Sequence, residues 1–171
     1  SDRRLTDHAM TARHTILVVD DDPAVLEALQ TIFEDDYKVI ACCSASETVR
    51  HLSEDSEIAA AVLDIKMAET NGLELGRRLR VLLPNTPIIF HTAYAGEFAE
   101  EEVDSSERPF DFIEKGTSTT RLQRSVRNAV QAYDSYAKSE NLVNEAKESF
   151  GMVGHSAAMQ EVFRLIRKVA T

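Results

Sequence analysis

Five polar residues stand at or just beyond the ends of short apolar runs, and together they could carry out phosphoryl chemistry. Asp20 and Asp21 close one run, and Asp64 closes another. Two later runs lead to Thr92 and to Lys115. Three carboxylates brought together repel one another, and Mg²⁺, a hard cation that prefers oxygen ligands, is their natural counter-charge.

The residue types indicate a role for each member of this group. A carboxylate next to a divalent cation can attack phosphorus, which makes Asp64 the candidate nucleophile. The hydroxyl of Thr92 and the ammonium of Lys115 can stabilise the remaining phosphoryl oxygens. Asp22 stands directly before Pro23, so we interpret it as a helix N-cap rather than a further metal ligand.

The elements that must position these residues alternate between apolar runs and helical periodicity. Strands are predicted at 16–20, 37–42, 59–64, 87–92 and 110–113. Helices are predicted after Asp22, from a capping box at Ser44 and Glu47 to about residue 53, after Asn71, over 95–104, and from Thr119 onward. This alternation predicts an α/β fold with a doubly wound parallel sheet, whose ligand site lies at the carboxyl ends of the strands.

Composition limits the function classes. The chain has 171 residues, is 43% hydrophobic and carries a net charge of −10, which is typical of a globular domain and disfavours direct nucleic-acid binding. No apolar run is long enough to cross a membrane and no secretory signal is present, so we expect a cytoplasmic protein. The adjacent pair Cys42 and Cys43 has neither metal-site spacing nor disulfide spacing.

Four motifs, in order, resemble the receiver domains of bacterial two-component response regulators. They are VVDDDP at 18–23, VLDIKM at 62–67, IIFHTA at 88–93 and FDFIEKG at 110–116. The resemblance implies a flavodoxin-like (CheY-like) five-stranded sheet with strand order 2-1-3-4-5. It also implies a regulatory phosphoacceptor rather than an enzyme, with a sensor histidine kinase as the phosphoryl donor.

The resemblance also implies site roles. Asp21 and Asp64 would bind Mg²⁺ directly, Asp20 would act through water, and the backbone carbonyl of Lys66 would be a further ligand. Phosphorylation would be coupled to movements of Thr92 and Phe112.

The sequence departs from this family at several positions near the site. Ala68 stands where the family often has proline, and Gly116 stands where it usually has a proline after the lysine. Arg108 and Pro109 replace small residues, and the stretch 97–107 is strongly acidic. These departures leave the chemical residues in place, but they affect the segments that would transmit a switch.

Beyond the receiver-like region, the chain divides into further segments. We predict a tail at 1–14, a receiver domain at 15–133, a helical linker at 134–149 and the start of a second domain at 150–171. An apolar stripe continues along the linker and favours a dimerising coiled coil, although charged residues interrupt it. The last segment resembles the opening of the AAA+ ATPase domain of NtrC-like activators of enhancer-dependent transcription, and the chain contains no phosphate-binding glycine loop.

Two other readings compete with a phosphorylation-dependent regulator. One is an aspartyl-nucleophile phosphatase, which commonly has an acid two residues after the nucleophile, where this chain has Lys66. The other is a degenerate receiver that serves only as a dimerisation scaffold. The complete set of acids, threonine and lysine argues against the scaffold.

Overall fold

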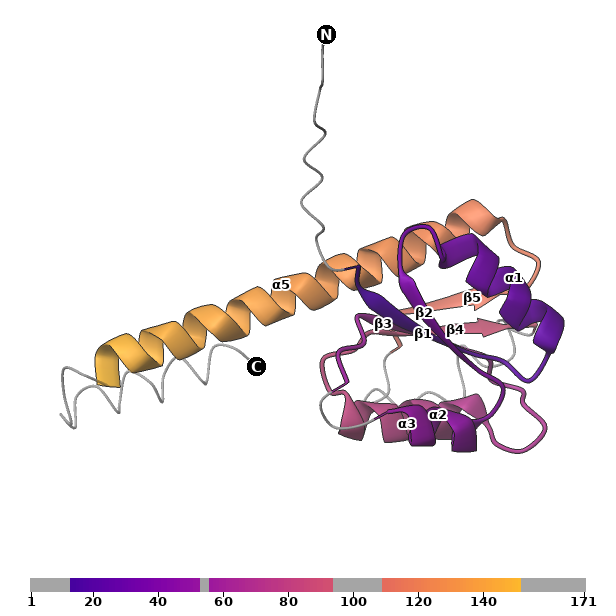
Figure 1. The fold of residues 1–171 in the computed structure, drawn as a ribbon, viewed down its shortest axis with the longest axis horizontal. Coiled ribbons are helices and arrows are strands. Elements are labelled where there is room, and N and C mark those ends of the chain that lie inside the picture. Colours follow the sequence, from indigo (N-terminus) through magenta and orange to yellow (C-terminus); the bar gives the residue numbers. More distant parts are fainter. Residues whose placement is uncertain (1–12, 53–55, 94–108, 152–171) are drawn as a thin grey trace, which may run out of the picture. The chain divides into compact units, whose positions relative to one another are not determined.

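The computed structural model describes residues 13–52, 56–93 and 109–151 of the chain. The described strands are β1 (Thr15–Val19), β2 (Lys38–Cys42), β3 (Ala60–Leu63), β4 (Ile88–Thr92) and β5 (Asp111–Glu114). The described helices are α1 (Pro23–Phe33), α2 (Ala45–His51), α3 (Gly72–Leu82) and α5 (Thr119–Gly151), shown in Figure 1. The helix predicted over 95–104 and the predicted start of a second domain lie outside the described residues, apart from the end of α5.

The five strands form one parallel sheet with the order β2-β1-β3-β4-β5. The predicted fold class and strand order are therefore confirmed. The predicted strand ends were wrong by about one residue, because Asp20 and Asp64 lie just beyond β1 and β3. Their N–H groups still continue the ladder to Cys42 and Val19, which leaves both carboxylates at the carboxyl edge of the sheet.

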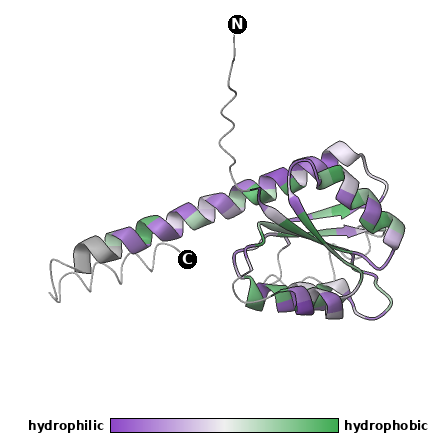
Figure 2. Cartoon of the chain, in the orientation of Figure 1, coloured by the Kyte–Doolittle hydropathy of each residue, from purple (hydrophilic) through white to green (hydrophobic). Residues whose placement is uncertain are grey.

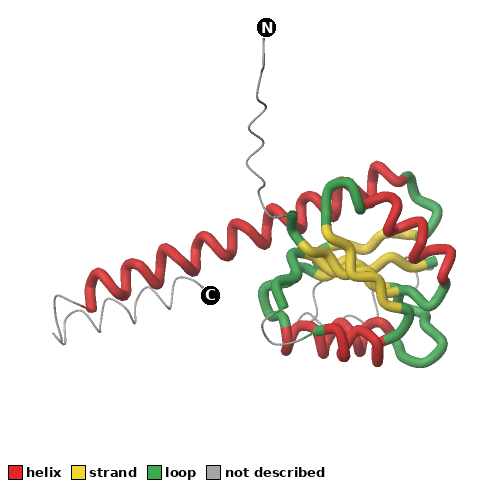
Figure 3. The backbone as a smooth tube through the Cα atoms, viewed as in Figure 1, coloured by secondary structure: helices red, strands yellow, loops and turns green. Residues whose placement is uncertain are grey.

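Helices cover both faces of this sheet, as Figure 3 shows, because each central strand is apolar on both sides. One cluster joins alternate strand residues to α2 and α3, and includes Leu17, Leu63 and Leu75. The other joins the opposite residues to α1 and the first part of α5, and includes Val18, Phe33 and Val126. Hydropathic colouring marks the same apolar strands between amphipathic helices (Figure 2).

Side-chain caps fix where the helices that flank the site begin. Asp22 accepts a hydrogen bond from the N–H of Ala24 at 2.9 Å, which confirms its role as the N-cap of α1. Ser44 caps α2 through the N–H of Glu47, and the Glu47 carboxylate returns to the N–H of Cys43. The second helix was predicted to reach about residue 53, but α2 ends at His51. The backbone of Leu52 is extended, and the side chain of Leu52 is buried in the core.

Helix α5 changes character along its length. Leu122, Val126 and Ala129 are buried against the sheet. Tyr136 and Val143 continue the same spacing but are 56% and 48% exposed. The boundary between two compact units falls between these groups, with one unit at Ser1–Asp134 and the other at Ser135–Thr171. In the described part of the chain, no helix is long and apolar enough to span a membrane.

Candidate functional site

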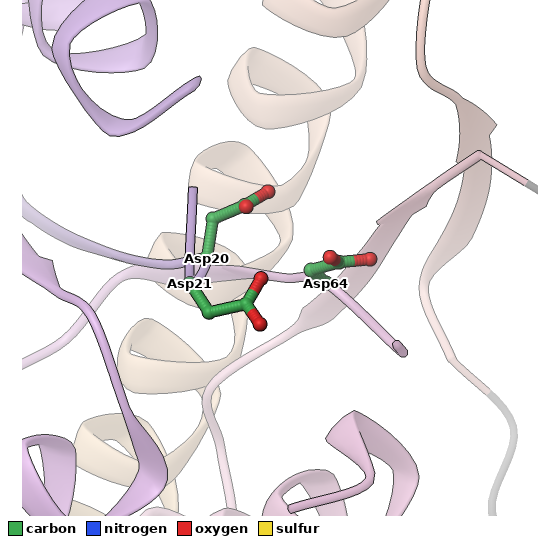
Figure 4. A group of neighbouring side chains, drawn as sticks. All are labelled: Asp20, Asp21 and Asp64. Carbon is green, nitrogen blue, oxygen red and sulfur yellow. The ribbon is translucent and has the colours of Figure 1, made fainter. Parts of the chain in front are cut away.

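The three acids that the sequence singled out meet at the carboxyl edge of the sheet (Figure 4). One carboxylate oxygen from each of Asp20, Asp21 and Asp64 lies within 4.8 Å of the others. Asp20 and Asp64 are 1% and 5% exposed, whereas Asp21 is exposed. Asp20 and Asp21 directly follow β1 and Asp64 directly follows β3, so the pairing of these neighbouring strands creates the cluster.

Lys115 joins this cluster from the end of β5. Its Nζ lies 2.7 Å from Oδ2 of Asp20 and 2.9 Å from Oδ2 of Asp64. Burial raises the pKa of Asp20, and its hydrogen bond to Lys115 only partly opposes this effect. Burial alone would lower the pKa of Lys115, but the hydrogen bonds to the two acids outweigh burial and raise it. One fixed positive charge therefore serves two buried carboxylates.

Thr92 is the last residue of β4 and is completely buried. It pairs with Glu114 across the sheet, and its carbonyl accepts a hydrogen bond of 2.8 Å from the N–H of Lys115. The sheet register thus places the predicted hydroxyl donor beside the predicted cationic residue.

The loop between β3 and α3 holds the remaining predicted ligand, the backbone of Lys66. Lys66 forms an isolated bridge with Asn71, and the N–H of Gly72 donates to the carbonyl of Ile65. A Cβ atom on Gly72 would overlap the backbone carbonyl oxygen of Asp64, so only glycine permits this close return of the chain. The loop is therefore folded tightly back against the end of β3.

A backbone contact that was not predicted from the sequence ties this loop to the acids. The N–H of Ala68 donates a hydrogen bond of 2.7 Å to Oδ2 of Asp21, across 47 residues of sequence. A backbone donor leaves no mark in residue type, although the absence of the family's proline at this position was a signal that the N–H exists.

Phe112, the predicted switch aromatic, lies on β5 and is partly buried. Its ring stacks on that of Phe90, with centroids 5.3 Å apart and planes at 28°. Phe112 therefore packs on the same face of the sheet as α2 and α3. The sequence identified Phe112 but not this aromatic partner on β4.

The turn after Lys115 has the shape that its glycine permits. The described residues contain no cis peptide bond, and Gly116 has a φ of 90°, in the left-handed region. The turn borders a cavity of about 330 Å³ that His91, Leu29 and Leu122 also line. His91 is half-buried there, and burial lowers its pKa.

The chemistry of the donor set fits a hard divalent cation. The acids offer carboxylate oxygens at close range, and the exposed Asp21 leaves one side of the cluster open to solvent. Oxygen ligands with open positions for water are the arrangement that Mg²⁺ favours. The fit therefore rests on the chemistry of these ligands.

Comparison with known proteins gives consistent similarities. The sequence profile described as "Response regulator receiver domain" matches residues 16–127. The chain is 30% identical over 166 residues to the regulatory protein AtoC of Escherichia coli, covering 94% of this chain and 35% of AtoC. It is 27% identical over 157 residues to the alginate biosynthesis transcriptional regulatory protein AlgB of Pseudomonas aeruginosa, covering 91% of this chain and 34% of AlgB.

Among solved structures, the chain is similar to the response regulator protein TrrA from Thermotoga maritima in complex with Mg²⁺ and BeF. The TM-score is 0.59 at 25% sequence identity, with 68% of this chain and 98% of that chain covered. The present chain spans about a third of the length of the curated relatives named above.

Proposed function

The chain belongs to the family of response regulator receiver domains, and we propose that Asp64 is the residue that accepts its phosphoryl group. The family expected from the sequence is thereby confirmed. Receiver domains are phosphorylated by sensor kinases and act as regulators. We also propose a role for each residue of the site, Mg²⁺ as its metal and a wider domain organisation.

The transfer is a substitution at phosphorus. A carboxylate oxygen of Asp64 forms a bond to phosphorus, and the bond from phosphorus to a histidine nitrogen of the kinase breaks. The electron pair of that bond returns to the imidazole, which takes a proton from solvent. Lys115 and the hydroxyl of Thr92 stabilise the transferred oxygens.

Mg²⁺ would supply the charge that allows a carboxylate to approach a phosphoryl group. Asp21 and Asp64 would hold it directly, Asp20 through water, and the backbone carbonyl of Lys66 as a further ligand. The similar structure of TrrA, solved with Mg²⁺ and BeF, supports the choice of metal. No separate cofactor is needed.

The observation that carries the proposal is the position of Lys115 between Asp20 and Asp64. Nζ lies within 3 Å of both carboxylates, each of which is nearly inaccessible to solvent. A phosphatase would need a general acid near the nucleophile, and the residue two positions on is the exposed Lys66. A scaffold would need neither the acids nor the lysine.

The remaining segments extend the proposal to partners. We assign 15–133 to the receiver, 134–149 to a linker that pairs with a second copy, and 150–171 to the start of an AAA+ domain in an NtrC-like regulator. The exposed Tyr136, Leu142 and Val143 support pairing through the linker. Movements of Thr92 and Phe112 would connect phosphorylation to the arrangement of that dimer.

Treatment with a small phosphodonor tests the phosphoacceptor assignment. The chain is incubated with Mg²⁺ and acetyl phosphate, and intact mass is measured together with molar mass by light scattering. We expect one phosphoryl adduct, no adduct when Mg²⁺ is chelated before the phosphodonor is added, and a shift in the proportion of dimer on phosphorylation.

Two variants of Asp64 and one variant of an exposed acid serve as controls for this test. Asp64→Ala and Asp64→Asn should form no adduct, whereas Asp35→Asn, which removes an exposed acid, should react as the wild type does. Turnover of acetyl phosphate without a lasting adduct would favour the phosphatase. Neither turnover nor adduct would leave only the scaffold.

A further inference from the structure

The hydrogen bond from Ala68 to Asp21 connects two parts of the site that are distant in sequence. The Ala68 N–H lies on the loop after β3, and the Asp21 carboxylate follows β1. The distance of 2.7 Å is short for an N–H donor, as expected for a bond to an ionised carboxylate. Asp21 is exposed, so this bond holds a carboxylate that solvent would otherwise leave free to rotate.

We propose that the backbone N–H of Ala68 is a positioning group that sets the Mg²⁺ affinity of the site through Asp21. The proposal rests on the function proposed above. Proline, which the resembling family often has at this position, carries no N–H and could not form the bond. A receiver domain with proline at this position therefore lacks the bond that this chain has.

The bond acts by ordering the ligand before the metal arrives. One oxygen of Asp21 is engaged by the N–H, which restricts rotation of the carboxylate and leaves the other oxygen for the cation. The same loop carries the backbone carbonyl of Lys66, the further proposed ligand. Asp21 and that carbonyl are thus linked in advance, which reduces the ordering cost of binding.

A second effect opposes the first. The N–H also stabilises the charge of Asp21 when no metal is present, which by itself would weaken metal binding. Groups that hydrogen-bond to metal ligands generally raise affinity, and their removal costs about 10- to 100-fold. We therefore expect ordering to dominate, with an effect of about tenfold because the bond is exposed to solvent.

Titration calorimetry of Mg²⁺ into the whole chain tests this proposal. Ala68→Ser keeps the N–H and should bind Mg²⁺ as the wild type does. Ala68→Pro removes the N–H and should weaken binding about tenfold. Raising Mg²⁺ to saturation should restore most of the rate of phosphorylation by acetyl phosphate that Ala68→Pro loses at low Mg²⁺, because the change acts on the positioning of a metal ligand.

A double-mutant cycle separates this effect from a general change in the loop. In an Asp21→Asn background, the further change Ala68→Pro should have little effect on Mg²⁺ affinity, because the residue through which it acts is altered. If proline weakens binding equally in both backgrounds, the proposal is wrong and the loop itself is responsible.

The other outcomes are also decisive. Equal affinity of the wild type and Ala68→Pro overturns the inference and leaves the proposed function intact. Absence of Mg²⁺ binding by the wild type overturns the metal site of the proposed function itself. If thermal unfolding shows that the proline variant does not fold, lactic acid in place of Ala68 keeps the side chain and replaces the N–H with an ester oxygen, and the Mg²⁺ affinity of that protein decides.

Discussion

Two ionic clusters on the same sheet show how a reactive site differs from a structural one. At the carboxyl edge, Asp20 and Asp64 share the single ammonium of Lys115. At the start of β5, Asp111 accepts two hydrogen bonds from Arg121, at 2.6 and 3.0 Å, and one from the hydroxyl of Ser125 at 2.7 Å. Two acids share one cation in the first cluster, whereas three donated hydrogen bonds serve one acid in the second.

The pKa directions record this difference. Burial works against ionisation of Asp111, but the bonds from Arg121 and Ser125 prevail and lower its pKa. At Asp20 the balance is reversed, and burial raises the pKa despite the bond to Lys115. The site at the carboxyl edge thus carries more negative than positive charge, and a metal cation can neutralise the excess. The Asp111 cluster needs no further cation, because Arg121 and Ser125 already donate to its carboxylate.

The largest effect should follow from Lys115→Met, which removes the shared cation. We expect phosphorylation by acetyl phosphate to slow by about 10²-fold, as is typical when one charge-stabilising group is lost. Two nearly buried acids would lose their partner, so the Mg²⁺-free protein should also be less stable, by about 2 kcal/mol after allowance for the partial exposure of the lysine.

Mg²⁺ should then stabilise Lys115→Met more than it stabilises the wild type, because the ion replaces the missing charge. Thermal unfolding with and without Mg²⁺ measures this, and Lys38→Met serves as an exposed control. Equal Mg²⁺-induced shifts in Tm for the wild type and Lys115→Met would mean that the lysine is not the counter-ion of the empty site.

A smaller and purely structural effect should follow from Asp111→Asn. The change weakens the paired bonds from Arg121, and we expect a loss of about 1 kcal/mol in the free energy of unfolding by urea. Mg²⁺ affinity and phosphorylation should be unchanged. A loss of phosphorylation would show that the two clusters are coupled and that their separation into reactive and structural sites is mistaken.

The wild-type stability contributed by the Asp111 cluster should also depend on pH. Because the folded-state pKa of Asp111 is lowered, its contribution is present above the unfolded pKa of about 3.9 and is lost as pH falls through the folded value. The gap in stability between the wild type and Asp111→Asn should therefore narrow under acidic conditions.

Most of the fold and the members of the site followed from sequence because each had a local signal. Apolar runs marked the strands, caps such as Asp22 marked helix starts, and acids at strand ends marked the edge where ligands bind. The parallel sheet then brings Asp20, Asp64 and Lys115 together from separate segments.

The features that sequence did not reveal depend on pairings between distant backbones and rings. Ala68 reaches Asp21 through a main-chain N–H, which is present in almost every residue and so carries no signal of its partner. Phe112 stacks on Phe90 because the β4–β5 register sets them opposite each other, and a shift of one residue would separate them. The predicted strand limits were wrong by about one residue because a strand ends where its backbone loses its hydrogen-bond partners, and residue type does not show where that happens.

The smallest effect concerns His91, which lies on β4 near Lys115 but outside both clusters. Its Nδ1 is buried and, among the described residues, has no hydrogen-bond partner. Burial lowers its folded-state pKa below the usual 6.5, with Lys115 adding to the shift and Asp64 opposing it. As pH falls, the unfolded chain therefore binds a proton at His91 before the folded chain does. Protonation of His91 consequently lowers the stability of the folded protein as pH drops below about 6.5.

Replacement of the imidazole by an amide tests this sign. Urea unfolding is measured at each pH, and the free energy of unfolding of each protein is compared with its own value at pH 8. Between pH 7 and pH 5 this free energy should fall less for His91→Asn than for the wild type. Nuclear magnetic resonance of the ring should place its titration below pH 6.5. A pKa of His91 above that value would mean that the negative charge at the carboxyl edge outweighs the effect of burial. Asp20 and Asp64 would then act electrostatically on a residue beyond Lys115, their direct contact.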